Sequence, residues 1–207
     1  MKQDVKWLFG ILLSLTLVLG LLPVMNTTAH ATDFQIWVGG KQVTSSNMNN
    51  VLGDGTVTFT YNEREQNGTL TLKGANIRGD HEGAAIYTGS PLIIRVEKDS
   101  TVTGSNRSIQ IYKEFNRKTS LTIEGPGTLT TKGGSDGVYT TVPLTVNGTL
   151  NATDTNCGVY AVGDLSSITA NGTLNATGGA ANESYGIYEA SIEDVGQATF
   201  CGALPGR

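Results

Sequence analysis

A three-part repeat runs through the chain from about residue 66 to residue 200, and it constrains the fold more than any other feature. The most regular copy is residues 136–153, DGVYTTVPLTVNGTLNAT, where three runs of three residues are separated by turn-forming residues. Such runs are too short to be stable alone, and the Asn-Gly and Gly-Gly pairs between runs supply the positive φ of sharp corners. A repeat of this kind is typical of one coil of a parallel β-solenoid.

Each of the three runs recurs with a recognisable pattern. The first run joins a β-branched residue to tyrosine, at Ile86–Tyr87, Ile111–Tyr112, Val138–Tyr139, Val159–Tyr160 and Ile187–Tyr188. The second run recurs at Leu92–Ile94, Leu121–Ile123 and Leu144–Val146, with stretched copies at Leu165–Ile168 and Ile192–Val195. The extra residue in the stretched copies is what a β-bulge produces. The third run recurs at Gly68–Leu70, Gly127–Leu129, Gly148–Leu150 and Gly172–Leu174, and more weakly at Ser100–Val102.

These patterns predict an all-β fold, a right-handed parallel β-helix whose coils bury their apolar residues by stacking. In the regular copy, the residues that we expect to point inward are Val138, Leu144, Val146 and Leu150, and those outward are Tyr139 and Thr145. An antiparallel β-sandwich is the alternative, because it also has short strands at regular spacing. The near-identical segments VNGTLNATD and ANGTLNATG favour the solenoid.

The chain divides into three parts. Residues 1–31 combine Lys2 and Lys6 with an apolar stretch and a terminal Ala-His-Ala, which predicts a secretory signal peptide. Residues 32–74 form an N-terminal β cap that contains a hairpin around Gly39–Gly40. Residues 75–207 carry the repeats and end without a clear cap, so either the last residues fold over the end or the chain is a piece of a longer array.

The signal peptide predicts an extracellular protein, either released or held at the cell surface. The alternative is an uncleaved N-terminal anchor, since the apolar stretch nearly has the length of a membrane span. No second apolar run follows, so we expect no stable membrane insertion after cleavage. Cys157 and Cys201 occupy different repeat positions, and nothing in the register places them together as a disulfide.

Charge argues against a nucleic-acid partner. The formal net charge is −4, and residues 133–206 contain seven acids but no Lys or Arg. Nucleic-acid binding requires a basic stripe, and the one dense basic segment lies at residues 107–118. That segment either contacts an anionic glycan or forms a solvated loop.

The repeated tyrosines are the candidate ligand-binding residues. Because neighbouring side chains of a strand point to opposite faces, an inward β-branched residue leaves its tyrosine outward. The predicted outward ladder consists of Tyr87, Tyr112, Tyr139, Tyr160 and Tyr188. Such a ladder either holds the apolar faces of sugar rings in a polysaccharide or has rings that only pack on one another.

The sequence offers little for catalysis. His81 is the only histidine after residue 31, which rules out a two-histidine metal site, and we expect it in a solvated loop with Asp80 and Glu82. A glycosidase needs two neighbouring carboxylates, yet Glu82 and Glu183, which share a repeat position, are four coils apart. We therefore expect no enzyme, no cofactor and no metal, although calcium bound by loop acids such as those of residues 133–137 is an alternative.

Several segments resemble a known family. They are IWVGGKQVT at residues 36–44, LGDGTV at residues 52–57, and the tandem G-[VI]-Y, L-T-[IV] and G-T-L units. They are similar to the secreted repeat proteins of anaerobic, mostly Gram-positive bacteria that are called carbohydrate-binding domain-containing proteins. The resemblance covers roughly residues 33–195 and implies a secreted or surface β-solenoid that binds sugars. The alternatives are a structural stalk or adhesin segment and, third, a polysaccharide lyase or hydrolase.

Overall fold

The computed structural model describes residues 32–113, 118–179, 185–189 and 192–201. They belong to one unit of the fold that spans residues 31–207. The predicted signal peptide lies outside the described residues. No helix with the length and apolarity of a membrane span occurs in the part of the chain that the structure describes.

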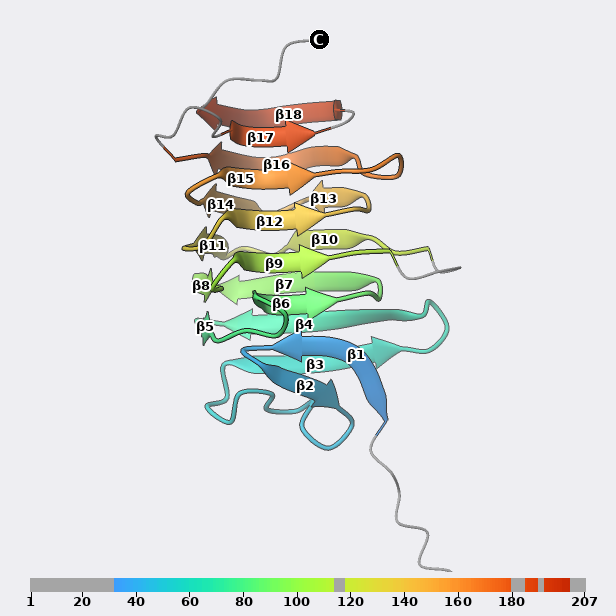
Figure 1. Cartoon of the computed structure of the whole chain (residues 1–207). Coiled ribbons are helices and arrows are strands. Elements are labelled where there is room, and N and C mark those ends of the chain that lie inside the picture. The colour runs from blue at the N-terminus through green and yellow to red at the C-terminus, as the bar shows by residue number, and fades with distance from the viewer. Residues whose placement is uncertain (1–31, 114–117, 180–184, 190–191, 202–207) are drawn as a thin grey trace, which may run out of the picture. The chain divides into compact units, whose positions relative to one another are not determined.

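The strands stack as the coils of a parallel β-solenoid with three faces (Figure 1). Face A consists of β6 (Ala84–Thr88), β9 (Arg107–Ile111), β12 (Asp136–Thr140), β15 (Cys157–Ala161) and β17 (Tyr185–Glu189). Each strand of this face pairs in parallel with the next. The prediction of a parallel solenoid is therefore confirmed, and the antiparallel sandwich is wrong.

Faces B and C share the longer strand β16 (Ile168–Thr177), whose two parts pair with different neighbours. Face B also contains β4 (Asn67–Lys73), β7 (Leu92–Lys98), β10 (Leu121–Glu124) and β13 (Leu144–Val146). Face C also contains β5 (Asn76–Arg78), β8 (Ser100–Thr103), β11 (Thr128–Lys132) and β14 (Thr149–Thr153). The strand β18 (Ile192–Cys201) pairs with β16 along both parts, with a register shift that agrees with the predicted bulge.

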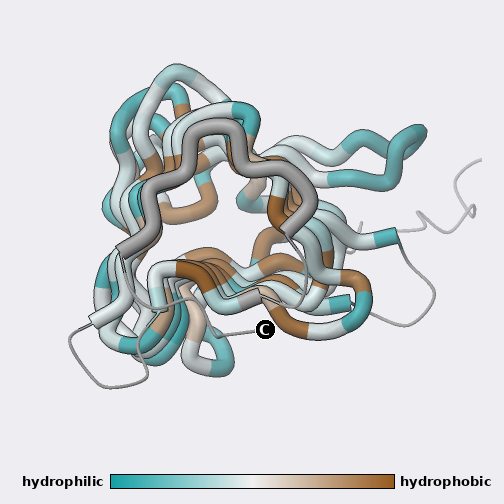
Figure 2. Tube along the Cα trace, turned by 90° about the horizontal axis from the view of Figure 1, so that it is seen from above, coloured by the Kyte–Doolittle hydropathy of each residue, from teal (hydrophilic) through white to brown (hydrophobic). Residues whose placement is uncertain are grey.

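The core lies between the three faces, and Figure 2 shows the coils superposed around it. Equivalent apolar residues stack in register from coil to coil, for example Leu121 with Leu144 and Ile123 with Val146. The four residues predicted to point inward, Val138, Leu144, Val146 and Leu150, are all 0% exposed. Tyr139 and Thr145 are half-buried on the outer surface, as predicted.

Two antiparallel hairpins cover the first coil. The strands β1 (Asp33–Val38) and β2 (Lys41–Thr44) form the predicted hairpin, with positive φ at Gly39 and Gly40. Strand β1 then pairs antiparallel with β6, which covers that edge of face A. The strand β3 (Val57–Asn62) pairs antiparallel with β4, and parallel stacking begins where β4 meets β7.

Three parts of the predicted repeat alignment are wrong. Ile109 and Gln110, not Ile111 and Tyr112, lie in register with Val138 and Tyr139. Leu165 is not the start of a second run, because Ile168 pairs with Leu144 and Leu165 is 51% exposed. The predicted third-run copies at residues 68–70 and 100–102 are also shifted, since Gly68 pairs with Leu92 on face B and Ser100 with Leu129.

Several outer side chains of faces B and C form hydrogen bonds with one another. Asn171 Nδ2 donates to Asn147 Oδ1 (2.9 Å), and Asn175 Nδ2 donates to Asn151 Oδ1 (2.8 Å). On face B, Arg95 donates to Glu124 Oε1 at 2.7 Å in the next coil. These contacts join successive coils, so the side chains stabilise the wall of the solenoid.

Candidate functional site

Three tyrosines of face A form a continuous row. Tyr139, Tyr160 and Tyr188 are register partners in β12, β15 and β17. Their ring centroids are 5.5 Å apart between Tyr139 and Tyr160 and 4.8 Å apart between Tyr160 and Tyr188. All three side chains are half-buried. We call these three residues the tyrosine row.

The ring faces of the tyrosine row are largely occupied within the protein. Neighbouring rings are tilted by only about 30° to each other, so each ring packs against the face of the next. The guanidinium carbon of Arg107 lies 3.7 Å from the centroid of Tyr139, a cation–π contact at the end of the row. None of the three hydroxyl groups has a hydrogen-bond partner among the described residues. The row therefore offers a ligand hydroxyl groups and ring edges rather than flat ring faces.

A second aromatic group lies at the N-terminal end of face A, where β1 covers β6. His81 stacks on Trp37 with 4.1 Å between ring centroids, and both contact Tyr87 edge-on. Tyr87 is 7% exposed, and its hydroxyl donates to Glu82 Oε2 at 2.8 Å. Burial first, and then the neighbouring Tyr112 and Glu82, raise the pKa of Tyr87. His81 lies in the predicted loop, where Asp80 and Glu82 are exposed, but its own ring is half-buried against Trp37.

The predicted ladder of five tyrosines is therefore two groups with a polar break between them. Tyr112 lies just beyond the end of β9 and contacts Tyr87, with 5.2 Å between centroids. Gln110 occupies the ladder position of that coil, between Tyr87 and Tyr139. Arg107 donates to Gln110 Oε1 at 2.9 Å, which fills the break with a hydrogen-bonded pair.

A buried acidic pair lies where face C turns into face A. Asp136 and Asp154 are each 5% exposed. Asp136 accepts a hydrogen bond from Asn156 (3.2 Å) and lies 3.7 Å from Arg107 Nε. The carboxylate oxygens of Asp154 have no hydrogen-bond partner among the described residues. Burial and then the charge of Asp136 raise the pKa of Asp154 to about 7.

The glycine after Asp136 is required by this corner. A Cβ atom at Gly137 would lie 2.5 Å from the carbonyl oxygen of Gly158 and 2.9 Å from Asp154 Oδ2. Such distances are too short for a side chain, so the turn between faces C and A can close only with glycine here. This explains why Gly precedes the Val-Tyr pair in the regular copies.

Metal ligands and cysteines do not gather in the described part of the chain. No cluster of three or more His, Cys, Asp or Glu side chains is found there. Cys157 is a free, buried thiol in β15, and burial raises its pKa to about 11. Cys201 belongs to β18, where it is the register partner of Thr177 on face C. Asp136, the acid of the glycine-rich segment proposed for calcium, is hydrogen-bonded to Asn156 and ion-paired with Arg107.

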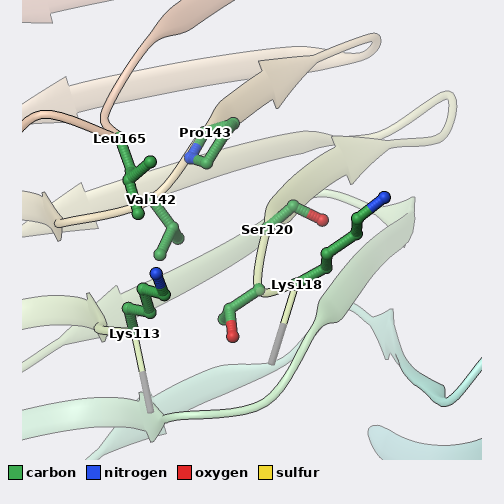
Figure 3. A pocket seen from close by; sticks show the side chains of 7 residues that line it. Lys113, Lys118, Ser120, Val142, Pro143 and Leu165 are labelled. Atoms are coloured by element: carbon green, nitrogen blue, oxygen red, sulfur yellow. The ribbon is translucent and has the colours of Figure 1, made fainter. Parts of the chain in front are cut away.

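A cavity of about 430 Å³ opens at the corner between face A and face B (Figure 3). Its residues come from the corners of three successive coils, namely Lys113, Lys118, Thr119, Ser120, Val142, Pro143 and Leu165. The side chain of Lys113 points toward Val142 and Leu165, while Lys118 extends away past Ser120 (Figure 3). The sequence reasoning noted the basic segment but missed this cavity. The pattern gives no signal for the cavity, because Leu165 fits a stretched copy of the second run as well as it fits a loop.

Comparisons with protein-family models, with curated proteins and with solved structures found no match. Function is therefore inferred from the geometry of face A and of the corner cavity.

Proposed function

We propose that the protein is a secreted or cell-surface, non-catalytic carbohydrate-binding module that holds a polysaccharide along face A. The observation that carries the proposal is the tyrosine row, in which three coils present in-register tyrosines whose hydroxyl groups have no partner among the described residues. Parallel strands repeat at about 4.8 Å, so the row presents polar groups at regular intervals. A polysaccharide likewise repeats its hydroxyl groups along its length.

The contrast with the other faces supports the choice of face A. On faces B and C, the asparagine rows and the Arg95–Glu124 pair use their hydrogen-bonding groups on one another. A ligand that bonds to those groups would have to break existing contacts, and the net gain from exchanging one hydrogen bond for another is small. On face A, a ligand that bonds to the hydroxyl groups replaces only water.

The burial of the acids supports a non-catalytic role. Asp136 and Asp154 lie at the corner that leads into face A, and each is 5% exposed. Asp136 is bonded to Asn156 and paired with Arg107, and Asp154 lies inside the corner. Neither carboxylate can reach the glycosidic bond of a chain on the outer surface, as glycoside hydrolysis requires.

The test is a panel of polysaccharides assayed with the protein and with the double variant Tyr139→Ala, Tyr160→Ala. We expect the parent protein to bind at least one polysaccharide, and the variant to bind it roughly tenfold or more weakly, a loss of about 1.4 kcal/mol. The matched control is Tyr61→Ala, which removes a 38% exposed tyrosine from β3 and should leave binding unchanged. Circular dichroism checks that both variants keep the β fold.

Two outcomes would contradict the proposal. If the parent protein binds no polysaccharide in the panel, the solenoid has a structural role, as a stalk does. If release of reducing or unsaturated ends accompanies binding, the protein is a hydrolase or lyase and the non-catalytic part of the proposal fails.

A further inference from the structure

We propose that the corner cavity binds a carboxylate-bearing sugar, so that the module selects acidic polysaccharides. This inference rests on the proposed function and names its ligand class. The cavity lies beyond the C-terminal ends of β9 and β12, which are two strands of face A. A polysaccharide that follows the tyrosine row can therefore place one sugar unit in the cavity.

The positive charge of the cavity is not neutralised by the described protein. Lys113 and Lys118 are both exposed, and neither forms an ion pair with any described residue. The ion pairs among the described residues lie outside the cavity and join Lys73 to Glu97, Arg95 to Glu124 and Arg107 to Asp136. Asp164 precedes Leu165 but does not line the cavity. Two ammonium groups without an acidic partner among the described residues, on a chain with a formal net charge of −4, favour an anionic ligand.

Backbone anchors hold the two lysines at the cavity. The amide of Lys113 donates to Thr141 Oγ1 of the next coil at 3.0 Å. Next to Lys118, the hydroxyl of Thr119 donates to the carbonyl oxygen of Gly89 in the preceding coil at 3.3 Å. Lys113 and Thr119, the residue after Lys118, are thus tied to neighbouring coils, which reduces the conformational freedom lost on binding.

The remaining wall is apolar and fits the C–H face of a sugar ring. Val142, Pro143 and Leu165 line the cavity, and Leu165 is 51% exposed. A volume of about 430 Å³ lies in the range of small-molecule sites, which are mostly apolar with a few polar groups that fix the ligand. Lys113 points toward Leu165 and Val142 (Figure 3), so a sugar packed on the exposed Leu165 has its carboxylate near that ammonium group.

The test measures binding of polygalacturonate, of the same polymer with its carboxylates methyl-esterified, of dextran and of dextran sulfate. We expect polygalacturonate to bind at least tenfold more tightly than its methyl ester, and its affinity to fall as salt screens the charges. The double variant Lys113→Ala, Lys118→Ala should lose that preference. The matched control, Lys98→Ala with Lys132→Ala, removes the same charge from two exposed lysines outside the cavity and should keep it.

The outcomes separate this inference from the proposed function. Equal binding of the acidic and esterified polymers, unaffected by the Lys113 and Lys118 changes, would overturn the acidic selectivity while leaving carbohydrate binding intact. Equal or tighter binding of dextran sulfate would show recognition of charge alone and would overturn the carboxylate assignment. If no polymer binds, the proposed function itself fails.

Discussion

At the scale of single residues, Asp154 is a buried carboxyl group whose surroundings disfavour its charged form. It is 5% exposed, it has no hydrogen-bond partner among the described residues, and it shares its corner with the charged Asp136. A buried carboxylate without partners is costly, and the protein reduces this cost by holding the proton. The stability of the fold should therefore depend on pH through this residue.

The prediction is that Asp154 destabilises the fold as pH rises. Its folded-state pKa, about 7, lies above its usual value of 3.8. The stability that the protonated Asp154 carboxyl group contributes to the fold is therefore fully present below about pH 4, and it is lost as pH rises through about 7. Asp154→Asn keeps the shape but cannot ionise, so we expect the variant to gain stability relative to the parent between pH 4 and 8. Urea denaturation across this range measures the difference.

The control for this prediction is Asp164→Asn, which removes an exposed acid from the turn before β16. It should leave the pH dependence of unfolding as it is in the parent protein. A parent and an Asp154→Asn variant whose stabilities change in parallel from pH 4 to pH 8 would show that Asp154 is ionised in the fold.

Residue-scale prediction from sequence failed at Tyr112 for a definable reason. A shift of two residues along a strand keeps each side chain on the same face, so both Gln110 and Tyr112 satisfy the alternation. The choice is made by the preceding turn, where the Asn106 amide donates to the Gly83 carbonyl and the Asn106 carbonyl accepts from Ser135. These contacts join three different coils and have no local signature in the sequence.

At the scale of elements, the inward and outward positions of one strand should differ sharply in energy. In β13, Leu144 is 0% exposed, whereas Thr145 is half-buried on the outer surface. We expect Leu144→Ala to destabilise the protein by about 2–5 kcal/mol because it leaves a cavity between stacked coils. Thr145→Ala, the neighbouring control, should change stability by less than about 1 kcal/mol. Chemical denaturation measures both, and similar losses would contradict the assigned faces.

Element prediction worked where the runs are regular and failed where they are stretched. The alternation of Leu, Thr and Val identifies β13 and its inward residues without ambiguity. Leu165 misled the alignment because an apolar residue in a loop is indistinguishable, by pattern alone, from one in a strand. The cavity that Leu165 lines is formed by three loops of different length. Its position depends on how the coils stack, so only the structure reveals it.

At the scale of the whole molecule, the N-terminal hairpin protects the stack. Strand β1 pairs with β6 and covers an edge that would otherwise present free backbone groups. We expect deletion of residues 32–44 to cause self-association, because the edge of β6 then pairs with other copies. Light scattering with size-exclusion chromatography measures this, and circular dichroism verifies the remaining β structure. A monomeric deletion variant that keeps its β structure would show that the hairpin is not needed to prevent association.

The whole-molecule architecture was the part most accessible to sequence reasoning. Near-identical segments must occupy equivalent positions, as Leu150 and Leu174 do in adjacent coils. This requirement defines the stacking before any single contact is known. The tyrosine row follows from it for Tyr139, Tyr160 and Tyr188, whereas Tyr87 is buried by the hairpin, a feature outside the repeat.

Stacked coils also give this chain a mechanical property. The coil that begins at Asp136 ends at its register partner Cys157, 21 residues later. Folded, it adds about 4.8 Å to the stack, whereas the same residues pulled straight span roughly 70 Å. Tension along the stacking direction meets the coils in series and unrolls them one after another. Each coil that opens becomes more than tenfold longer, so a polymer bound as proposed and dragged by flow would be held by an extensible connection rather than a rigid one.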